Sequence, residues 1–277
     1  PSVAQPENRI AATRRAGIMS RLSIPGLMAP LLALLLWACA DEGGGPGDVG
    51  AGDGRPADGV AAPDGTPGGE GGVDGPARTC AGPGEDATRG ARCTADVFTF
   101  GAKTRGMIVC RPDPLPAGPL PVVLAFHGGG GNATQWKKRN PWQDTAARHG
   151  FVVAFMQGCK ATLTDCSRAA GSYMWSVGKK GTTVVQDDQG YVLEALKRLE
   201  TVHKLDIDAG CRFATGHSLG GIFTYSLLCD RPQLLAAIGP ISAPPTDATC
   251  TPHGGTSIFH VHGDLDANVP FDTGCCS

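Results

Sequence analysis

The sequence predicts an α/β domain built on a mostly parallel, doubly wound sheet with helices on both faces. Three observations predict it. Short apolar runs bounded by Gly or Pro are typical of buried strands. These runs alternate with longer segments whose apolar residues recur at helical spacing, an order that favours a parallel sheet covered on both faces. A glycine-rich turn then separates one run from an apolar helix at 216–221.

The expected strands, in order, cover residues 121–126, 151–156, 211–215, 235–238 and 257–262. Between the first two, residues 134–149 are long enough for a helix, which Pro141 must start or kink. A second helix is expected over 187–203, because its apolar residues share one helical face. A third, apolar helix is expected to run from the glycine-rich turn through Cys229.

The 277 residues divide into three predicted regions. Residues 1–39 resemble an export signal, with Met19 as a candidate start and no apolar run long enough to span a membrane. The sequence around Cys39 resembles a bacterial lipoprotein signal, so lipidation of Cys39 is expected; simple cleavage nearby is the alternative. Residues 40–79 are rich in Gly, Pro and Asp and are expected to form a disordered tether. Residues 80–277 form the predicted catalytic domain.

Composition narrows the function classes. A net charge of −2 and 6% aromatic residues disfavour a nucleic-acid partner. The 11 Cys favour an oxidising compartment. Cys159 with Cys166, and Cys229 with Cys250, are candidate disulfide pairs, and the absence of a C-x-x-C spacing disfavours a zinc ribbon. No requirement for a nucleotide, metal or haem cofactor is evident.

The strongest catalytic motif is Gly216-His-Ser-Leu-Gly220, which matches the G-x-S-x-G nucleophile elbow between a strand and a helix. Such a tight turn needs residues without side chains two positions before and after the serine. We expect it to hold Ser218 at the carboxyl end of the strand, where the helix N-terminus favours developing negative charge. Ser218 is therefore the candidate nucleophile; a glycine-rich turn without chemistry is the alternative.

A second motif, His127 followed by four glycines, comes directly after the strand 121–126. A loop of this kind supplies backbone N–H groups to an oxyanion hole. The candidate donors are Gly128, Gly129 and Leu219. His127 is expected to be structural rather than the catalytic base. A phosphate-binding loop is disfavoured, since no G-K-[ST] follows.

A third motif places Asp264 and Asp266 after the strand 257–262, where the acid of a Ser–Asp–His triad belongs in chain order. His260 and His262 alternate with Val261, so both rings are expected on one side of the strand. That spacing also suits metal ligands, but no further ligand set converges on them and no metal site is predicted.

Four stretches together carry a family resemblance: HGGGGNA at 127–133, DDQGYVLEAL at 187–196, GHSLGG at 216–221 and HGDLDANVP at 262–270. By them the chain resembles the secreted polyhydroxybutyrate depolymerase/feruloyl esterase group of α/β-hydrolases, over about residues 105–272. The resemblance implies that Asp266, rather than Asp264, is the triad acid. It also implies that Asp187 and Asp188 belong to a structural helix start.

The catalytic histidine of the resemblance would follow the acid, but all seven His precede Asp266. We therefore expect a sequence truncated or altered near 273–277, with the last strand and helix missing. His253 is a spare histidine in the wrong chain order. A serine without a base is a weak nucleophile, and loss of a triad member costs about 10⁴-fold in rate.

The predicted function is an exported serine carboxylic-ester hydrolase that acts through an acyl-enzyme. The resemblance implies feruloyl or acetyl esters of polysaccharide, or a polyhydroxyalkanoate, and export suits a polymeric substrate. The expected partner is an ester substrate, with membrane contact only through the lipid anchor. Two alternatives stay open: a catalytically inactive surface lipoprotein that uses the fold for binding, and a peptidase on the same fold.

Overall fold

The fold is seen in a computed structural model, which describes residues 10–13, 19–22, 80, 83–168, 171–177, 186–245, 250 and 256–271. Cys39, the 40–79 segment, His253 and residues 273–277 lie outside the described residues. The predictions of lipidation, of a tether and of an altered C-terminal end therefore stay predictions.

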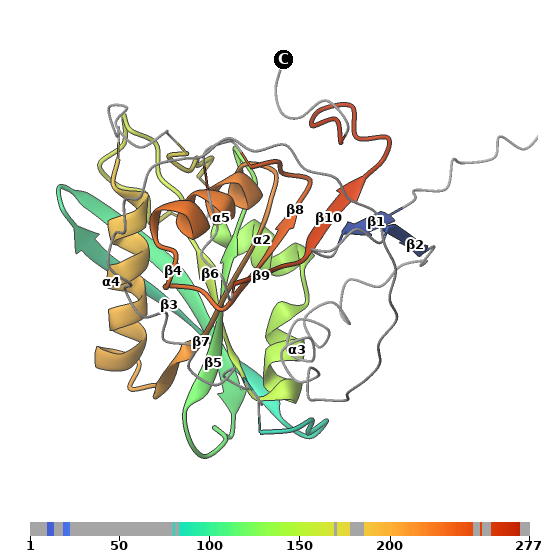
Figure 1. The fold of residues 1–277 in the computed structure, drawn as a ribbon. Helices are drawn as coiled ribbons and strands as arrows, with labels where there is room; N and C mark the ends of the chain where they lie inside the picture. Colours follow the sequence, from blue (N-terminus) through green and yellow to red (C-terminus); the bar gives the residue numbers. More distant parts are fainter. Residues whose placement is uncertain are drawn as a thin grey trace, which may run out of the picture.

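One sheet runs through the molecule, with β9 pairing beside β8 and the other strands in the order β2-β1-β10-β8-β7-β5-β6-β4-β3 (Figure 1). Strands β6, β5, β7, β8 and β10 pair in parallel, whereas β3 and β4 form an antiparallel pair at one edge. This strand order is that of the α/β-hydrolase fold, the fold class that the sequence predicts. The strands are β1 Ile10–Thr13, β2 Met19–Leu22, β3 Gly90–Phe100, β4 Lys103–Asp113, β5 Leu120–Phe126, β6 Val152–Met156, β7 Ile207–His217, β8 Ala237–Ile241, β9 Ser257–Ile258 and β10 His260–Gly263.

The helices begin and end where the local sequence directs. Pro141 splits the expected first helix into α2 (Ala133–Arg139) and α3 (Trp142–His149). Asp187 caps α4 (Asp188–Thr201) by accepting a hydrogen bond from the Gly190 N–H at 2.7 Å. Helix α5 (Leu219–Asp230) follows β7 after a single residue, Ser218.

The core has two layers, one on each face of the sheet. On β5, Val122, Leu124 and Phe126 pack in one cluster with residues of α4 and α5. Val123 and Ala125, which alternate with them, pack in the other cluster with residues of α2 and α3. All five are essentially inaccessible to solvent, as expected for a central parallel strand, so helices on both faces are confirmed.

Three details differ from the sequence-based expectation. The antiparallel pair β3–β4 was not predicted, because its charged and apolar residues do not form one continuous apolar run. Strand β7 begins four residues before Cys211. The expected strand over 257–262 is interrupted at Phe259, although both halves keep one register along β8, with Ser257 opposite Ala237 and Val261 opposite Ile241.

Four disulfides connect the described residues. Cys159–Cys166 and Cys229–Cys250 confirm the two candidate pairs. The other two disulfides were not predicted. Cys80 and Cys211 are 131 residues apart in sequence, and Cys93 and Cys110 face each other across the β3–β4 hairpin, which was not predicted either. Disulfides in this number are typical of proteins that fold in an oxidising compartment.

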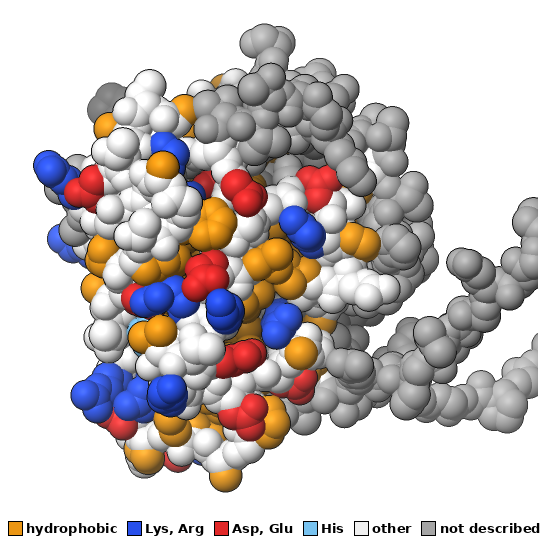
Figure 2. Space-filling model, turned by 90° about the vertical axis from the view of Figure 1, so that its left-hand side faces the viewer, with side chains coloured by type: hydrophobic (Ala, Val, Ile, Leu, Met, Phe, Trp, Pro, Cys, Tyr) orange, Lys and Arg blue, Asp and Glu red, His pale blue; other side chains and the backbone are white. Residues whose placement is uncertain are grey.

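The surface that carries α4 and β3 mixes Lys and Arg with Asp and Glu side chains among hydrophobic ones (Figure 2). Among the described residues, no helix has both the length and the apolar character needed to cross a lipid bilayer.

Candidate active site

Ser218 occupies the turn between β7 and α5. Its backbone has φ 53° and ψ −123°, a conformation that residues with a side chain rarely adopt. The turn is held by the Ser218 N–H, which donates to the Ile241 carbonyl of β8 at 2.9 Å. A strained strand-to-helix turn with a serine at its tip is the geometry of a nucleophile elbow.

Close backbone contacts explain the glycines of the turn. A Cβ on Gly216 would lie 2.4 Å from the carbonyl carbon of Gly220, and one on Gly220 would lie 2.5 Å from the carbonyl oxygens of Phe126 and His127. Both positions therefore exclude any side chain. The same contacts press the elbow against the end of β5, where the His127–Gly131 loop begins.

The glycine loop lies beside the elbow. The Cβ position of Gly128 is 3.7 Å from Ser218 Cβ, and that of Gly129 is 3.5 Å from Leu219 Cβ. The N–H groups of Gly130 and Gly131 are used within the chain, donating to the carbonyls of Tyr173 and Gly128. Among the described residues, no hydrogen-bond acceptor is found for the N–H groups of Gly128 and Gly129. The Leu219 N–H, in the first turn of α5, has no partner within its own helix.

His127 is buried and held by two backbone groups. The Gly158 N–H donates to Nε2 at 3.0 Å, so Nδ1 carries the proton and donates to the Gly128 carbonyl at 2.8 Å. Burial lowers the pKa of His127 to about 4. The ring is therefore neutral and fully engaged at neutral pH, in the structural role expected for it.

Residues 171–177 brace this loop from outside. The Gly130 N–H donates to Tyr173 O and the Tyr173 N–H donates to Gly131 O, while the indole N–H of Trp175 donates to His127 O. The brace is tied in turn to the Cys159–Cys166 loop, because the Cys159 N–H donates to the Met174 carbonyl at 2.9 Å.

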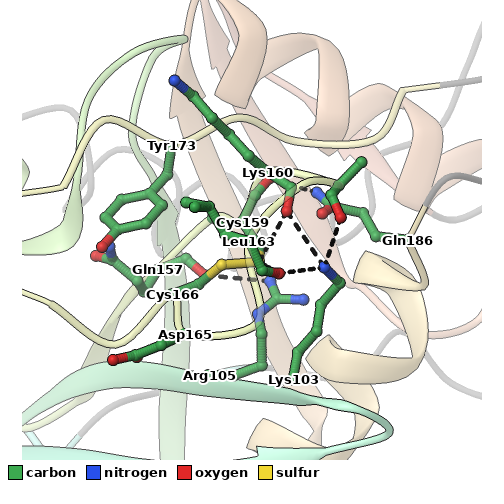
Figure 3. Close-up of a disulfide and its surroundings, with 12 residues drawn as sticks. Lys103, Arg105, Gln157, Cys159, Lys160, Leu163, Asp165, Cys166, Tyr173 and Gln186 are labelled. Atoms are coloured by element: carbon green, nitrogen blue, oxygen red, sulfur yellow. Dashed lines mark hydrogen bonds between the residues drawn. A yellow bond between two sulfur atoms is a disulfide. The ribbon is translucent and has the colours of Figure 1, made fainter.

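Figure 3 shows the surroundings of this disulfide, with side chains converging on its backbone carbonyls. The Lys103 ammonium donates to the carbonyls of Lys160, Ala161 and Leu163. The Gln186 amide donates to the Cys159 carbonyl at 2.6 Å. The disulfide loop is therefore fixed covalently and by a lysine that reaches across from β4.

Behind the brace lies a buried ion pair that the sequence did not reveal. Arg105 of β4 and Asp188 of α4 are 2.7 Å apart, and neither side chain is more than 1% exposed. Asp188 also accepts the Ser176 N–H and the Gln186 amide. Burial raises the pKa of Asp188, and the Arg105 charge opposes that shift. Because the pair is 83 residues apart in sequence, no local pattern signals it.

On the other side of the elbow, Asp266 lies in the turn after β10. Its Oδ1 accepts the N–H groups of Asn268 and Val269, both at 2.9 Å. The hydrogen bond from the Val269 N–H contributes most to holding the pKa of Asp266 below its usual value. Hydrogen bonds from the Asn268 N–H and the Ser242 hydroxyl lower it further. The neighbouring Asp264 is exposed.

His217, next to the nucleophile, connects the two sides. Desolvation lowers the pKa of His217, and the Asp266 carboxylate partly offsets that shift. Ile241, which accepts the Ser218 N–H, is followed by Ser242, whose N–H donates to the Val261 carbonyl of β10 at 2.8 Å, so the elbow lies next to the strand that leads to Asp266. The His217 ring stacks on Trp136 of α2, with centroids 6.1 Å apart. The structure thus gathers Ser218, Leu219, Gly128, Gly129 and Asp266 in one region.

Apolar side chains border this region. Met174 is 41% exposed, and its methyl carbon lies 3.6 Å from the Cβ position of Gly129. Leu219 touches the same position. An apolar rim over the oxyanion loop suits a hydrophobic acyl group.

Within the described residues, no group of three or more His, Cys, Asp or Glu is arranged to hold a metal ion. His260 and His262 do lie on one side of β10, as expected, but their ring nitrogens face each other, 3.0 Å apart.

No family model matches the chain. It is 26% identical over 147 residues to the bifunctional acetylxylan esterase/xylanase XynS20E of Neocallimastix patriciarum, covering 53% of this chain and 19% of that protein. It is 31% identical over 156 residues to a protein of Aspergillus clavatus named "Probable feruloyl esterase C", covering 55% and 51%. The chain spans about half the length, or less, of the curated relatives it matches.

Similar solved structures include a ferulic acid esterase, at 16% identity with a TM-score of 0.43 over 56% of this chain and 61% of that one. An acetyl xylan esterase from Aspergillus awamori matches at 20% identity with a TM-score of 0.42 over 53% and 51%. The expected link to polyhydroxybutyrate depolymerases is not shown by these relatives. Over about half of its length the chain is therefore similar in sequence to feruloyl and acetylxylan esterases, which are carboxylic-ester hydrolases, and its strand order is that of the α/β-hydrolase fold.

Proposed function

We propose that this chain is the catalytic domain of an exported serine esterase that removes acyl groups, feruloyl in the first place, from a polysaccharide. The observation that carries the proposal is the strained turn at Ser218 with Gly128 and Gly129 beside it. A serine in this conformation, next to free backbone donors, is arranged for acyl transfer. The curated relatives supply the substrate class.

In the proposed mechanism, Ser218 Oγ attacks the ester carbonyl and a tetrahedral oxyanion forms. The N–H groups of Gly128, Gly129 and Leu219 stabilise the oxyanion, and its collapse expels the sugar alcohol and leaves an acyl-enzyme. Water then attacks the acyl-enzyme and releases the acid. The proton transfers need an imidazole as general base, and Asp266 is the acid proposed to orient it; no histidine of the given sequence follows Asp266, so no residue is assigned to that role.

The apolar side chains at the rim of the site favour a large, hydrophobic acyl group. Met174 and Leu219 border the oxyanion loop, and Trp136 stacks beside the elbow. A feruloyl group carries an aromatic ring that can bury area against such side chains, whereas an acetyl group offers only a methyl. We therefore expect feruloyl esters to be preferred over acetyl esters.

A fluorophosphonate probe tests the nucleophile, because it labels only an activated serine. The protein is expected to be labelled, and Ser218→Ala to lose all labelling. Ser257→Ala, which removes an exposed serine of β9, is the matched control and is expected to be labelled like the parent. Release of ferulate from a feruloylated polysaccharide then tests the substrate.

Two outcomes would contradict the proposal. An unlabelled, folded protein would favour a binding role for the fold. A labelled protein that cleaves peptides but no esters would favour a peptidase on the same fold.

A further inference from the structure

Two histidines beside the acid turn have no role in the proposed chemistry, yet they form a continuous hydrogen-bonded chain. The Tyr225 hydroxyl lies 2.7 Å from His260 Nδ1, and His260 Nε2 lies 3.0 Å from His262 Nδ1. His262 Nε2 lies 2.6 Å from the Val269 carbonyl oxygen. The chain begins on α5, crosses β10 and ends in the turn that carries Asp266.

The direction of every hydrogen bond in this chain follows from the acceptor at its end, the Val269 carbonyl. A carbonyl oxygen can only accept, so His262 Nε2 must carry a proton and donate to Val269. A neutral His262 then accepts at Nδ1, which requires a proton on His260 Nε2. His260 Nδ1 is left as an acceptor, and the Tyr225 hydroxyl donates to it. The chain therefore runs one way, with both rings neutral and in the Nε2–H tautomer.

The surroundings support neutral rings. His262 is 2% exposed, and Phe271 packs edge-on against both imidazoles. Burial and the neighbouring His262 lower the pKa of His260 to about 4. The other titratable groups that face the chain are Tyr225, whose pKa burial raises to about 12, and Asp266, whose Oδ2 lies 3.8 Å from His262 Nε2.

Both backbone groups of Val269 are hydrogen-bonded. Its carbonyl accepts from His262, and its N–H donates to Asp266 Oδ1. Asp266 is thereby fixed through Oδ1, while Oδ2 stays on the side of His262. Because Tyr225 belongs to the helix that starts directly after Ser218, the chain links the nucleophile's helix to the acid's turn.

We propose that His260 and His262 are positioning residues: their one-way chain from Tyr225 to the Val269 carbonyl fixes the Asp266 carboxylate relative to Ser218. The role of Asp266 as the catalytic acid rests on the proposed function, whereas the direction of these hydrogen bonds does not. The arrangement also disfavours metal binding by these two rings, because their facing nitrogens already share a proton with each other.

The first test is nitrogen-15 NMR of the histidine rings in the whole protein at pH 7. We expect both rings to be neutral Nε2–H tautomers, each with an N–H proton that exchanges slowly with water. Either ring in the Nδ1–H form, or a His260 ring that titrates near pH 6.5, would contradict the proposed hydrogen-bonded chain. This reading is independent of whether the protein hydrolyses any ester.

The second test follows the Asp266 carboxylate by carbon-13 NMR in the parent, in Tyr225→Phe and in His262→Phe. In His262→Phe, the pKa of Asp266 is expected to rise towards its ordinary value, because Val269 is no longer held. Tyr225→Phe preserves the aromatic ring and should raise the pKa of Asp266 by a smaller amount. An unchanged carboxylate pKa in His262→Phe overturns the positioning role, and if that variant does not fold, Tyr225→Phe together with the tautomers decides.

Kinetics provide the third reading in an active protein. His262→Phe is expected to lower kcat on the order of 10- to 100-fold, with KM within about twofold, because a displaced acid affects the chemical step. His262→Gln, which keeps a donor near Val269, should recover part of the loss. His149→Phe, a substitution at the far end of α3, is the matched control. Lowered stability with unchanged kcat would show that the hydrogen-bonded chain is merely structural. A parent protein without esterase activity would refute the proposed function, and the NMR results alone would then decide whether the hydrogen-bonded chain exists.

Discussion

The two sides of Ser218 are built in different ways. On the oxyanion side, the His127–Gly131 loop is braced by residues 171–177, and behind the brace lie a disulfide and a buried ion pair. On the acid side, Asp266 lies in a turn at the end of β10 that neutral rings and backbone groups hold. An oxyanion hole consists of backbone donors and works only if the backbone is rigid. An acid that serves an imidazole needs only the correct orientation.

This difference predicts that the oxyanion side carries more of the folding stability, and that the acid side affects chemistry with little change in stability. Substitutions on each side separate the two contributions. Each unfolding measurement below is made in urea on the protein with its disulfides oxidised.

The largest effect is expected from Arg105→Met, which leaves the Asp188 carboxylate buried without its cation. Breaking a buried pair costs about 3–5 kcal/mol of unfolding free energy. The loss should be smaller at pH 5 than at pH 7, because burial raises the pKa of Asp188 and a protonated carboxyl needs no cation. Glu194→Gln breaks the exposed pair with Lys197 and should cost no more than about 1 kcal/mol. Equal costs for the two variants would contradict the comparison.

Acid is expected to weaken the oxyanion side through His127. The pKa of His127 is about 4 in the folded state and 6.5 when free, so below pH 6.5 the unfolded chain binds the proton more tightly. Stability from this ring is complete above pH 6.5 and falls by about 3 kcal/mol as the pH decreases to 4. Unfolding measured at several pH values, with an NMR titration of His127, checks this. A ring that titrates near 6.5 would refute it.

The two predicted disulfides give a matched pair, one tied to the brace of the oxyanion loop and one at the C-terminal end of α5. Removing Cys159–Cys166 with two alanines should cost about 2.5 kcal/mol, and removing Cys229–Cys250, which closes a longer loop, about 3 kcal/mol. Their effects on activity should rank the other way. Only the Cys159 loop holds the brace of the oxyanion loop, so its removal should lower kcat more. Equal kcat values in the two double variants would show that the brace does not depend on the disulfide.

The sequence was most informative where function depends on consecutive residues. The turn at Ser218, the loop at Gly128–Gly129 and the short Cys159–Cys166 spacing could all be read locally, because each is confined to a few positions. The mostly parallel sheet could be predicted from the alternation of apolar runs with helices. The bounds of β7 could not be read, because its first residues alternate in polarity and resemble a loop.

The supporting contacts could not be predicted, for a physical reason. Arg105 in a strand looks like a solvated residue until the fold brings Asp188 against it. His260 and His262 had the spacing of metal ligands, and only the carbonyl at the end of their chain reveals the direction of the bonds. Both cases depend on partners distant in sequence or on the backbone, which no local pattern encodes.

The smallest expected effect concerns the acyl group. Met174→Ala removes apolar area beside the oxyanion loop without touching a donor, so kcat/KM for a feruloyl ester should fall about 10-fold, in line with about 1–3 kcal/mol for hydrophobic pocket contacts. The value for an acetyl ester should change by less than about twofold, because a methyl group does not reach the rim. Leu193→Ala, an exposed substitution on α4, is the control. If both esters lose equally, Met174 supports the rigid oxyanion side rather than the substrate, and the brace would extend to the rim of the site.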